Sequence, residues 1–324
     1  MTKICIFGAG AIGGYVGARL AMKGEADVSL VARGPHLAAM KANGLTLKQE
    51  GETHVVRPRV TADPKELGPQ DFVILTLKAH GLAAVIDQMM PLIGEHTAIL
   101  FAQNGIPWWY FHGIGGPFEG TRLETVDPGG QIWNRLGPGR AIGSVVWQAA
   151  EIEAPGVIAH HYGDRMPIGE PTGEKTARAL LLSRLLTAAG VKSPVRPNLR
   201  NEIWLKLWGN LSFNPVSVLT EGTLGELAAD PGTRRVIRTM MEEARAVAEK
   251  LGVTFAVDAE ERMDMAAKVG NHRTSMLQDV TAGRPTELDA LLGVVIELSR
   301  IVQIGTPSLQ LVYDLCKFRS RIPG

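Results

Sequence analysis

The stretch Lys3-Ile-Cys-Ile-Phe-Gly8-Ala9-Gly10-Ala11-Ile12-Gly13 decides how the first half of the chain folds. Its apolar beginning predicts a buried strand, and the residues after it predict a helix that extends to about Lys23. The first glycine of such a turn permits a tight bend, the second lets a pyrophosphate approach the backbone, and the third lets helix and strand pack closely. The pattern predicts a dinucleotide site made of Gly8, Ala9, Gly10, Ala11, Ile12 and Gly13. The alternative is a tight turn that binds nothing.

Short apolar runs alternate with helix-like segments as far as the prolines Pro194 and Pro197. This alternation predicts a parallel sheet with crossover helices, and the continuous apolar character of each run indicates strands that are covered on both faces. We expect strands at residues 3–7, 27–31, 71–77 and 98–102. We expect the same sheet to resume at 141–148 and to continue through 157–161, followed by a helix over 173–189 and a strand over 191–195.

Strand signals become scarce after Pro197, and the remaining segments predict helices at residues 198–219, 230–251, 256–269 and 286–304. Thr286, with Asp289 three residues later, resembles a capping box in which Asp replaces the usual Glu. The sequence therefore predicts an α/β protein in two parts. We expect residues 1–196 to form an N-terminal Rossmann-type dinucleotide-binding domain and residues 197–324 to form a C-terminal all-helical domain.

The composition is that of a globular protein, with 45% hydrophobic and 21% charged residues in a chain of 324. The formal net charge is +1 and no stretch concentrates one sign, which argues against nucleic acid as a partner. The apolar runs are shorter than the roughly 18 residues of a membrane span, and no signal peptide is recognisable. We therefore expect a cytoplasmic protein without a membrane partner. Two cysteines and scattered histidines predict neither a disulfide framework nor a metal site.

The end of the second predicted strand indicates which dinucleotide is bound. An NAD-specific protein places an acidic residue there, on the ribose hydroxyls. Here Asp27 lies at the wrong end of the strand, and the tip carries Ala32 and Arg33, whose guanidinium suits a 2′-phosphate. We therefore predict NADPH/NADP+ rather than NADH as the cofactor. The alternative is that Arg33 is a solvated loop charge.

Lys206, Asn210 and Asn214 are spaced by four residues and so project from one face of a predicted helix that is otherwise mostly apolar. Asparagine amides are costly in such surroundings unless they find partners, and a ligand pocket would supply them. A lysine in such a pocket can protonate an oxygen that gains negative charge. The alternative is a surface lysine paired with Glu202, and the spacing by itself does not decide between the two.

Motifs spread over nearly the whole chain resemble the ketopantoate reductases (2-dehydropantoate 2-reductases). Members of this family reduce a branched 2-oxo acid with NADPH in pantothenate synthesis. Each motif is weak when taken singly, and the set in this order is specific. The motifs are Gly8 to Gly13, Ala32-Arg33-Gly34, Thr76-Leu-Lys78-Ala79, Gln103-Asn104-Gly105, Trp204-Leu-Lys206 with Asn210 and Asn214-Pro215, Ser275-Met-Leu-Gln-Asp279, and Gly283-Arg-Pro-Thr-Glu287-Leu-Asp289.

The resemblance implies a role for individual residues. Lys206 would donate the proton to the ketone oxygen, and Asn210 and Asn214 would hold the hydroxyl end of the substrate. Ser275 would meet the substrate carboxylate, and Asn104 would lie between nicotinamide and substrate. Lys78 would lie near the cofactor. Glu287 would take part in catalysis against the nicotinamide side of the cofactor or against Lys206.

Two departures from the family pattern leave the substrate open. An aromatic stretch from Trp108 to Phe111 begins a long Gly/Pro-rich loop to about Arg140, which would either cover the substrate pocket or form the interface of a homodimer. Leu224 replaces a polar substrate contact. The alternatives are therefore a related NAD(P)-dependent dehydrogenase of another oxo or hydroxy acid, and a non-catalytic NADPH-binding sensor.

Overall fold

The computed structural model describes residues 1–321, which form two compact units. The first unit contains Met1–Gln103, Trp109–Arg122 and Gly130–Leu199. The second unit contains Asn104–Trp108, Leu123–Gly129 and the described residues from Arg200 onward. The predicted fold class is confirmed, since parallel strands in the first half of the chain are followed by helices in the second. Two short segments of the first half fold with the later helices, which the sequence patterns did not indicate.

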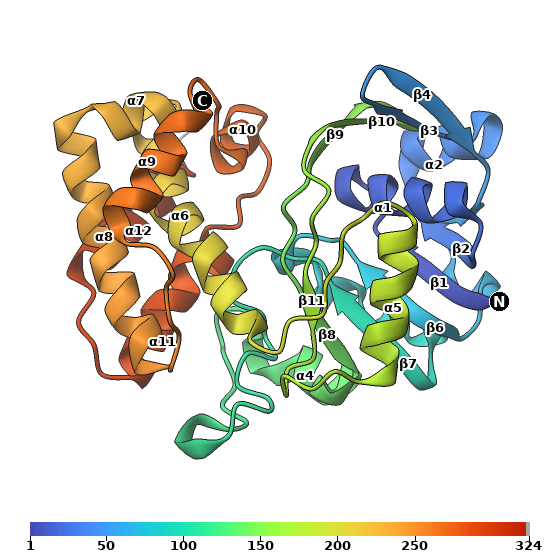
Figure 1. Cartoon of the computed structure of the whole chain (residues 1–324), viewed down its shortest axis with the longest axis horizontal. Coiled ribbons are helices and arrows are strands. Elements are labelled where there is room, and N and C mark those ends of the chain that lie inside the picture. The colour runs from blue at the N-terminus through green and yellow to red at the C-terminus, as the bar shows by residue number, and fades with distance from the viewer. Residues whose placement is uncertain (322–324) are drawn as a thin grey trace. The chain divides into compact units, whose positions relative to one another are not determined.

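The first unit is built on a seven-stranded sheet in the order β11-β8-β7-β6-β1-β2-β5 (Figure 1). Neighbouring strands run parallel, except that β11 is antiparallel to β8. The central strands are buried on both faces, as their continuous apolar runs predict. The strands are β1 (Thr2–Phe7), β2 (Ala26–Val31), β5 (Arg59–Thr61), β6 (Gln70–Leu75), β7 (Ile93–Phe101), β8 (Ala141–Ser144) and β11 (Ile168–Gly169).

A second, four-stranded sheet in the same unit has the order β4-β3-β10-β9, with β3 at Leu45–Gln49, β4 at Glu52–Val56, β9 at Ala149–Ala154 and β10 at Val157–Tyr162. Helix α1 (Ala11–Lys23) contacts strands of both sheets, which explains why Tyr15, Val16, Ala18 and Leu20 are buried. The unit also contains α2 (Gly34–Asn43), α3 (Ile86–Met89), α4 (Gln131–Leu136) and α5 (Ala177–Ala188).

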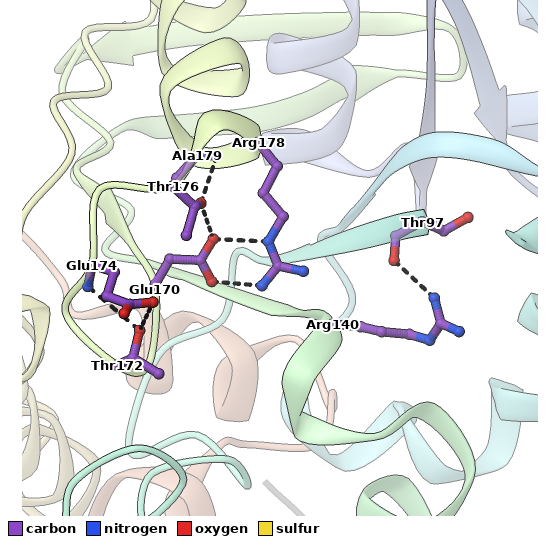
Figure 2. A network of polar contacts seen from close by, with 8 residues as sticks. All are labelled: Thr97, Arg140, Glu170, Thr172, Glu174, Thr176, Arg178 and Ala179. Carbon is purple, nitrogen blue, oxygen red and sulfur yellow. Dashed lines mark hydrogen bonds and ion pairs between the residues drawn. The ribbon is translucent and has the colours of Figure 1, made fainter. Parts of the chain in front are cut away.

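A buried carboxylate joins β11 to α5 in the first unit (Figure 2). Glu170 accepts hydrogen bonds from both Nε and Nη2 of Arg178, at 2.8 and 2.6 Å, and from the hydroxyl of Thr176 at 2.5 Å. Thr176 in turn accepts the N–H of Ala179 and so caps α5.

Figure 2 also shows a separate contact, in which Arg140 donates to the carbonyl oxygen of Thr97 at 3.2 Å.

The second unit is helical over its described residues. Long helix α6 carries the polar stripe, and α8 has a strongly amphipathic sequence that buries its apolar face. A π-helical turn at Asp289–Gly293 leads into α11. The helices are α6 (Leu199–Thr220), α7 (Leu224–Ala229), α8 (Pro231–Lys250), α9 (Ala259–Val269), α10 (Ser275–Thr281), α11 (Val294–Ile301) and α12 (Pro307–Arg319). Over residues 1–321, no helix combines the length and apolar character needed to cross a membrane.

Two expectations about strands were wrong. Residues 157–161 do not continue the main sheet, because β10 pairs with β3 and β9 of the second sheet instead. Residues 191–195 form only isolated bridges, at Lys192 and Val195. Pro194 lacks the N–H that a regular ladder requires, so this segment stays irregular.

The predicted capping box at Thr286 was also wrong. The π-helical turn that begins at Asp289 has no side-chain cap, and the Asp289 carboxylate accepts hydrogen bonds from Tyr313 and Lys317 of α12. The Asp289 side chain, which the local pattern assigned to a helix cap, therefore makes tertiary hydrogen bonds with α12 instead.

The aromatic stretch after Gly105 packs inside the protein. Trp109, Tyr110 and Phe111 are buried within the first unit. The rings of Phe111 and Phe118 lie 5.9 Å apart, and Trp109 packs against Gly143 of β8. These side chains are core residues and so are not available as the surface of a subunit interface.

Candidate functional site

The glycine turn between β1 and α1 leaves room for a phosphate group. Gly8 has a φ of +99°, which favours glycine, and a Cβ on Gly13 would overlap both the Gly8 carbonyl oxygen and the Thr76 hydroxyl. A Cβ on Gly10, in contrast, would meet only the Gly8 oxygen, at 4.0 Å. Helix α1 begins at Ala11 without a side-chain cap. The open space at Gly10 and the amides at the start of α1 fit the pyrophosphate of a dinucleotide.

Strands β2 and β6 flank this turn on either side of β1. The N–H groups of Gly8 and Ala9 donate to the carbonyl oxygen of Val31, at 3.2 and 3.0 Å. On the other side, the Thr76 hydroxyl donates to the Gly8 carbonyl oxygen at 2.5 Å. The strand order changes direction between β1 and β6, which is where open α/β sheets bind their ligands.

Arg33 and Lys78 follow the same two strands. Arg33 is exposed and precedes α2 directly after the end of β2, and Lys78 lies three residues beyond the end of β6. The structure therefore places both cations at the sheet edge that carries the glycine turn. Of the other predicted cofactor residues, Ala9 is buried and Ala11 and Ile12 form the first turn of α1.

Lys206, Asn104 and Glu287 form a hydrogen-bonded chain within the second unit. The ammonium of Lys206 donates to Oδ1 of Asn104 at 2.7 Å, and Nδ2 of Asn104 donates to the Glu287 carboxylate at 3.3 Å. Lys206 comes from α6, whereas Glu287 precedes the π-helical turn. Asn104 thus links a cation and an anion through the two ends of one amide.

The electrostatics of this cluster favour proton transfer near neutral pH. Burial lowers the pKa of the Lys206 ammonium from 10.5 to about 8, and the Glu287 carboxylate partly opposes that shift. Lys206 is partly buried and donates to Asn104, which favours a role in the pocket over a solvated surface lysine. A group that titrates near 8 can hold a proton at neutral pH and also release it.

Asn210 and Asn214 continue along α6 from Lys206. Asn214 is only 5% exposed, and its side-chain amide makes no hydrogen bond to another residue in the described part of the chain. Its amide is not among the fully buried polar groups that lack a partner, so it reaches solvent and is available to a polar ligand. Asn210 is partly buried on the same face of the helix.

Ser275 is exposed at the start of α10, which is attached to the Asn214 end of α6. The attachment is a hydrogen bond of 2.6 Å between the hydroxyls of Ser217 and Thr274. Thr274 also caps α10 by accepting the N–H of Leu277. The predicted substrate residues Asn104, Lys206, Asn210, Asn214 and Ser275 all belong to the second unit, whereas the predicted cofactor residues apart from Asn104 and Glu287 belong to the first.

Sequence reasoning missed Thr76 and Thr274 as supporting residues. Thr76 follows an apolar run just as Gly8 does, so its position at a strand end was a usable signal. Thr274 directly precedes Ser275, and the cap preference of threonine could have indicated it. In residues 1–321, no group of three or more His, Cys, Asp and Glu side chains could hold a metal ion.

Comparisons with known proteins match this architecture over nearly its whole length. The family "Ketopantoate reductase PanE/ApbA" matches residues 4–108, and "Ketopantoate reductase PanE/ApbA C terminal" matches residues 198–320. A 2-dehydropantoate 2-reductase of Mesorhizobium japonicum is 55% identical over 315 residues, which cover 97% of each chain. A dinucleotide-binding turn and a partly buried lysine fit a nicotinamide-dependent oxidoreductase, and the protein is of this class. The chain belongs to the ketopantoate reductase family.

Solved structures agree with this assignment. A PanE/ApbA family ketopantoate reductase from Ralstonia eutropha JMP134 is 26% identical, with a TM-score of 0.85 and coverage of 99% of each chain. D-mandelate dehydrogenase, solved with NADH and anilino(oxo)acetate, has a TM-score of 0.83 at 21% identity and covers 99% of each chain. At that identity the likeness is one of fold.

Proposed function

We propose that this protein reduces a 2-oxo acid to a 2-hydroxy acid with NADPH, and that Lys206 is the proton donor. The first candidate substrate is 2-dehydropantoate (ketopantoate), reduced to pantoate in pantothenate biosynthesis. One observation carries the proposal: the Lys206 ammonium donates to Asn104 at 2.7 Å, in surroundings that lower its pKa to about 8. The 55% identity to a 2-dehydropantoate 2-reductase supports the choice of substrate.

In this proposal the first unit binds the cofactor. The backbone amides from Gly8 to Gly13 hold the pyrophosphate, Arg33 pairs with the 2′-phosphate, and Lys78 adds positive charge at the same sheet edge. The nicotinamide of the bound cofactor supplies the hydride. The predicted boundary between an NADP-binding and a catalytic domain, at residues 196 and 197, stays a prediction, as do a homodimer and a cytoplasmic location.

The second unit provides the acid and the substrate contacts. Lys206 gives its proton to the ketone oxygen as negative charge develops there, and so stabilises that charge where it forms. Asn210 and Asn214 orient the hydroxyl end of the substrate, and Ser275 meets its carboxylate. Asn104 and Glu287 orient the lysine through the observed hydrogen-bonded chain.

The competing function is reduction of another 2-oxo acid on the same fold. Leu224, the first residue of α7, favours it, because this apolar side chain lies where the family pattern has a polar substrate contact. The backbone N–H of Leu224 donates to the carbonyl oxygen of His272, three residues before Ser275, so α7 is tied to the segment that leads into α10. A non-catalytic sensor would have no use for a lysine poised as an acid.

The test measures consumption of NADPH or NADH with a panel of 2-oxo acids that includes ketopantoate. We expect ketopantoate to give the highest kcat/KM, and NADPH to be preferred over NADH. Arg33→Ala should raise the KM for NADPH while leaving that for NADH nearly unchanged. A preference for a different oxo acid would support the competing function, and a preference for NADH would remove Arg33 from cofactor selection.

A further inference from the structure

The π-helical turn Asp289–Gly293 provides a backbone acceptor for a segment outside its own helix. In a π-turn each amide bonds five residues back, and here the N–H of Val294 donates to the carbonyl oxygen of Asp289. The carbonyl oxygen of Ala290 accepts the N–H of Ile106 at 3.2 Å. Such turns are often found at functional sites. This one anchors the residues that directly follow Asn104.

Gly105 makes the close approach of the two segments possible. Its φ is +90°, and a Cβ at this position would overlap the Ala290 carbonyl oxygen and lie 2.7 Å from the Ala290 carbonyl carbon. Both the backbone conformation and the available space therefore require glycine. The contact leaves the backbone on each side of Gly105 little freedom to shift.

The same turn is joined to Glu287. The carbonyl oxygen of Glu287 accepts the N–H of Leu291 within the turn at 3.0 Å, so the Glu287 backbone is part of the start of this helix. Its side chain accepts the Asn104 amide. The π-turn is thus hydrogen-bonded to Glu287 and to Ile106, which lies two residues after Asn104.

Helix α12 holds the turn in place. The Asp289 carboxylate accepts hydrogen bonds from the Tyr313 hydroxyl at 2.6 Å and the Lys317 ammonium at 2.9 Å. A Cβ on Gly293 would lie 3.0 Å from the Tyr313 ring, so that ring also packs on the last residue of the turn. The turn is therefore supported by two side chains of α12, Tyr313 and Lys317.

We propose that Gly105 is a positioning residue of the reaction: by seating on the Ala290 carbonyl it holds Asn104 against Lys206 and Glu287. The inference rests on the proposed function and deepens it, since it assigns the alignment of the acid to a backbone contact. A misplacement of about 1 Å can lower a rate by about 100-fold. Gly105→Ala should therefore impair turnover without touching the substrate or the reacting atoms.

The first test is a double-mutant cycle on kcat with Gly105→Ala, Asn104→Ala and the double variant. If Gly105 acts through Asn104, Gly105→Ala lowers kcat at least about 10-fold, and the double variant loses no more than Asn104→Ala does, within about twofold. Losses that multiply would overturn the proposal, because they would mean independent roles. Gly252→Ala is the matched control, since Gly252 also has a positive φ, +82°, but has no atom within 4 Å of its Cβ position.

The second test needs no substrate. The pKa of Lys206 is measured from the pH dependence of its labelling by an amine-reactive reagent, followed by mass spectrometry. Gly105→Ala and Asn104→Ala should shift this pKa in the same direction and by a similar amount, and Gly252→Ala should not shift it. The proposal is overturned if Asn104→Ala alone shifts the pKa, or if neither variant does.

These readouts separate the proposal from the proposed function. Retained activity in Lys206→Ala would exclude Lys206 as the proton donor. The labelling experiment would still report whether Gly105 holds Asn104 against Lys206. Tyr313→Phe covers the case in which Gly105→Ala does not fold. It removes only one hydroxyl that holds the turn, and we expect a smaller pKa shift in the same direction; no shift in this variant would then overturn the proposal.

Discussion

At the residue scale, the environment of Lys206 gives an ordinary side chain an unusual pKa. The Lys206 side chain is partly buried, and its ammonium contacts the Asn104 amide. Desolvation penalises its charged form, while the Asn104 oxygen and the Glu287 charge stabilise that form in part. The balance is a group that is still protonated at neutral pH.

The pH dependence of turnover should reveal this group. Because burial lowers the Lys206 pKa from 10.5 to about 8, the donor form is present below about pH 8 and lost above it. We expect kcat/KM for oxo acid reduction to fall above about pH 8, and Lys206→Ala to lower turnover about 100-fold or more while cofactor affinity survives. Lys250→Ala, at the exposed end of α8, is the control. A rate that is constant up to pH 10 would contradict the assignment.

Asn214 should contribute to substrate binding more than to stability. Its amide has no hydrogen-bond partner among the described residues, so Asn214→Ala should change the free energy of unfolding by less than about 1 kcal/mol. The KM for the oxo acid should rise about tenfold, the size of one lost hydrogen bond. Ser212→Ala is the control on the same helix. The Ser212 hydroxyl donates to the Trp208 carbonyl oxygen within α6, so this variant should leave the KM unchanged. Steady-state kinetics and urea unfolding give both numbers, and an unchanged KM would exclude the role.

At the element scale, the three glycines of the β1–α1 turn serve different purposes. Gly8 adopts a backbone conformation that favours glycine, and Gly13 lets α1 approach β1 and Thr76. Gly10 touches no side chain, so its lack of a Cβ serves neither the turn nor the packing. The remaining explanation is space for a ligand at the start of the helix.

Two alanine variants should separate packing from binding. Gly13→Ala should lower the free energy of unfolding by about 1–3 kcal/mol, because the new methyl overlaps the Gly8 carbonyl oxygen. Gly10→Ala should change it by less than about 0.5 kcal/mol and raise the Kd for NADPH about tenfold or more. Urea unfolding and NADPH fluorescence titration measure the two effects. Equal NADPH affinity in Gly10→Ala and the unsubstituted protein would rule out the phosphate site.

At the scale of the whole molecule, each unit is held together by contacts between segments far apart in sequence. In the first unit, Glu170 ties the end of β11 to α5 through Arg178 and Thr176 (Figure 2). In the second, the Glu297 carboxylate accepts the N–H groups of Glu124 and Thr125 at 2.8 and 2.9 Å, and so binds the segment Leu123–Gly129 to α11.

Removal of the buried Glu170 carboxylate should lower the stability of the protein. Glu170→Ala leaves the Arg178 guanidinium, one third exposed at 33%, without its bidentate partner, and should lower the free energy of unfolding by about 3 kcal/mol. Glu25→Ala breaks exposed ion pairs with Lys23 and Arg184 and should cost less than about 0.5 kcal/mol. Urea denaturation compares them. Equal losses in the two variants would show that burial of Glu170 does not matter.

Several long elements were predicted well, whereas the 13-residue helix α12 and most short elements were not. The predicted helix at 198–219 is α6, Leu199–Thr220, and the predicted strand at 27–31 is β2, Ala26–Val31. Helices α7 and α10 went unpredicted, because six or seven residues are too few to show a helical period. Strands β3 and β4 were also missed, although they pair with each other locally as a hairpin. Only the pairing of β3 with β10 depends on residues more than a hundred positions away.

Local sequence alone was enough to predict the glycine turn, the polar stripe on α6 and the family. Each of these depends on spacing within one element or on ordered motifs. The resemblance implied that Glu287 lies against Lys206 or the nicotinamide, and only the tertiary structure showed that Asn104, 102 and 183 positions away along the chain, joins the two. The physical reason is that a carbonyl of the π-turn and a glycine without a Cβ place this segment among the helices. Neither periodicity nor residue preference encodes such a contact.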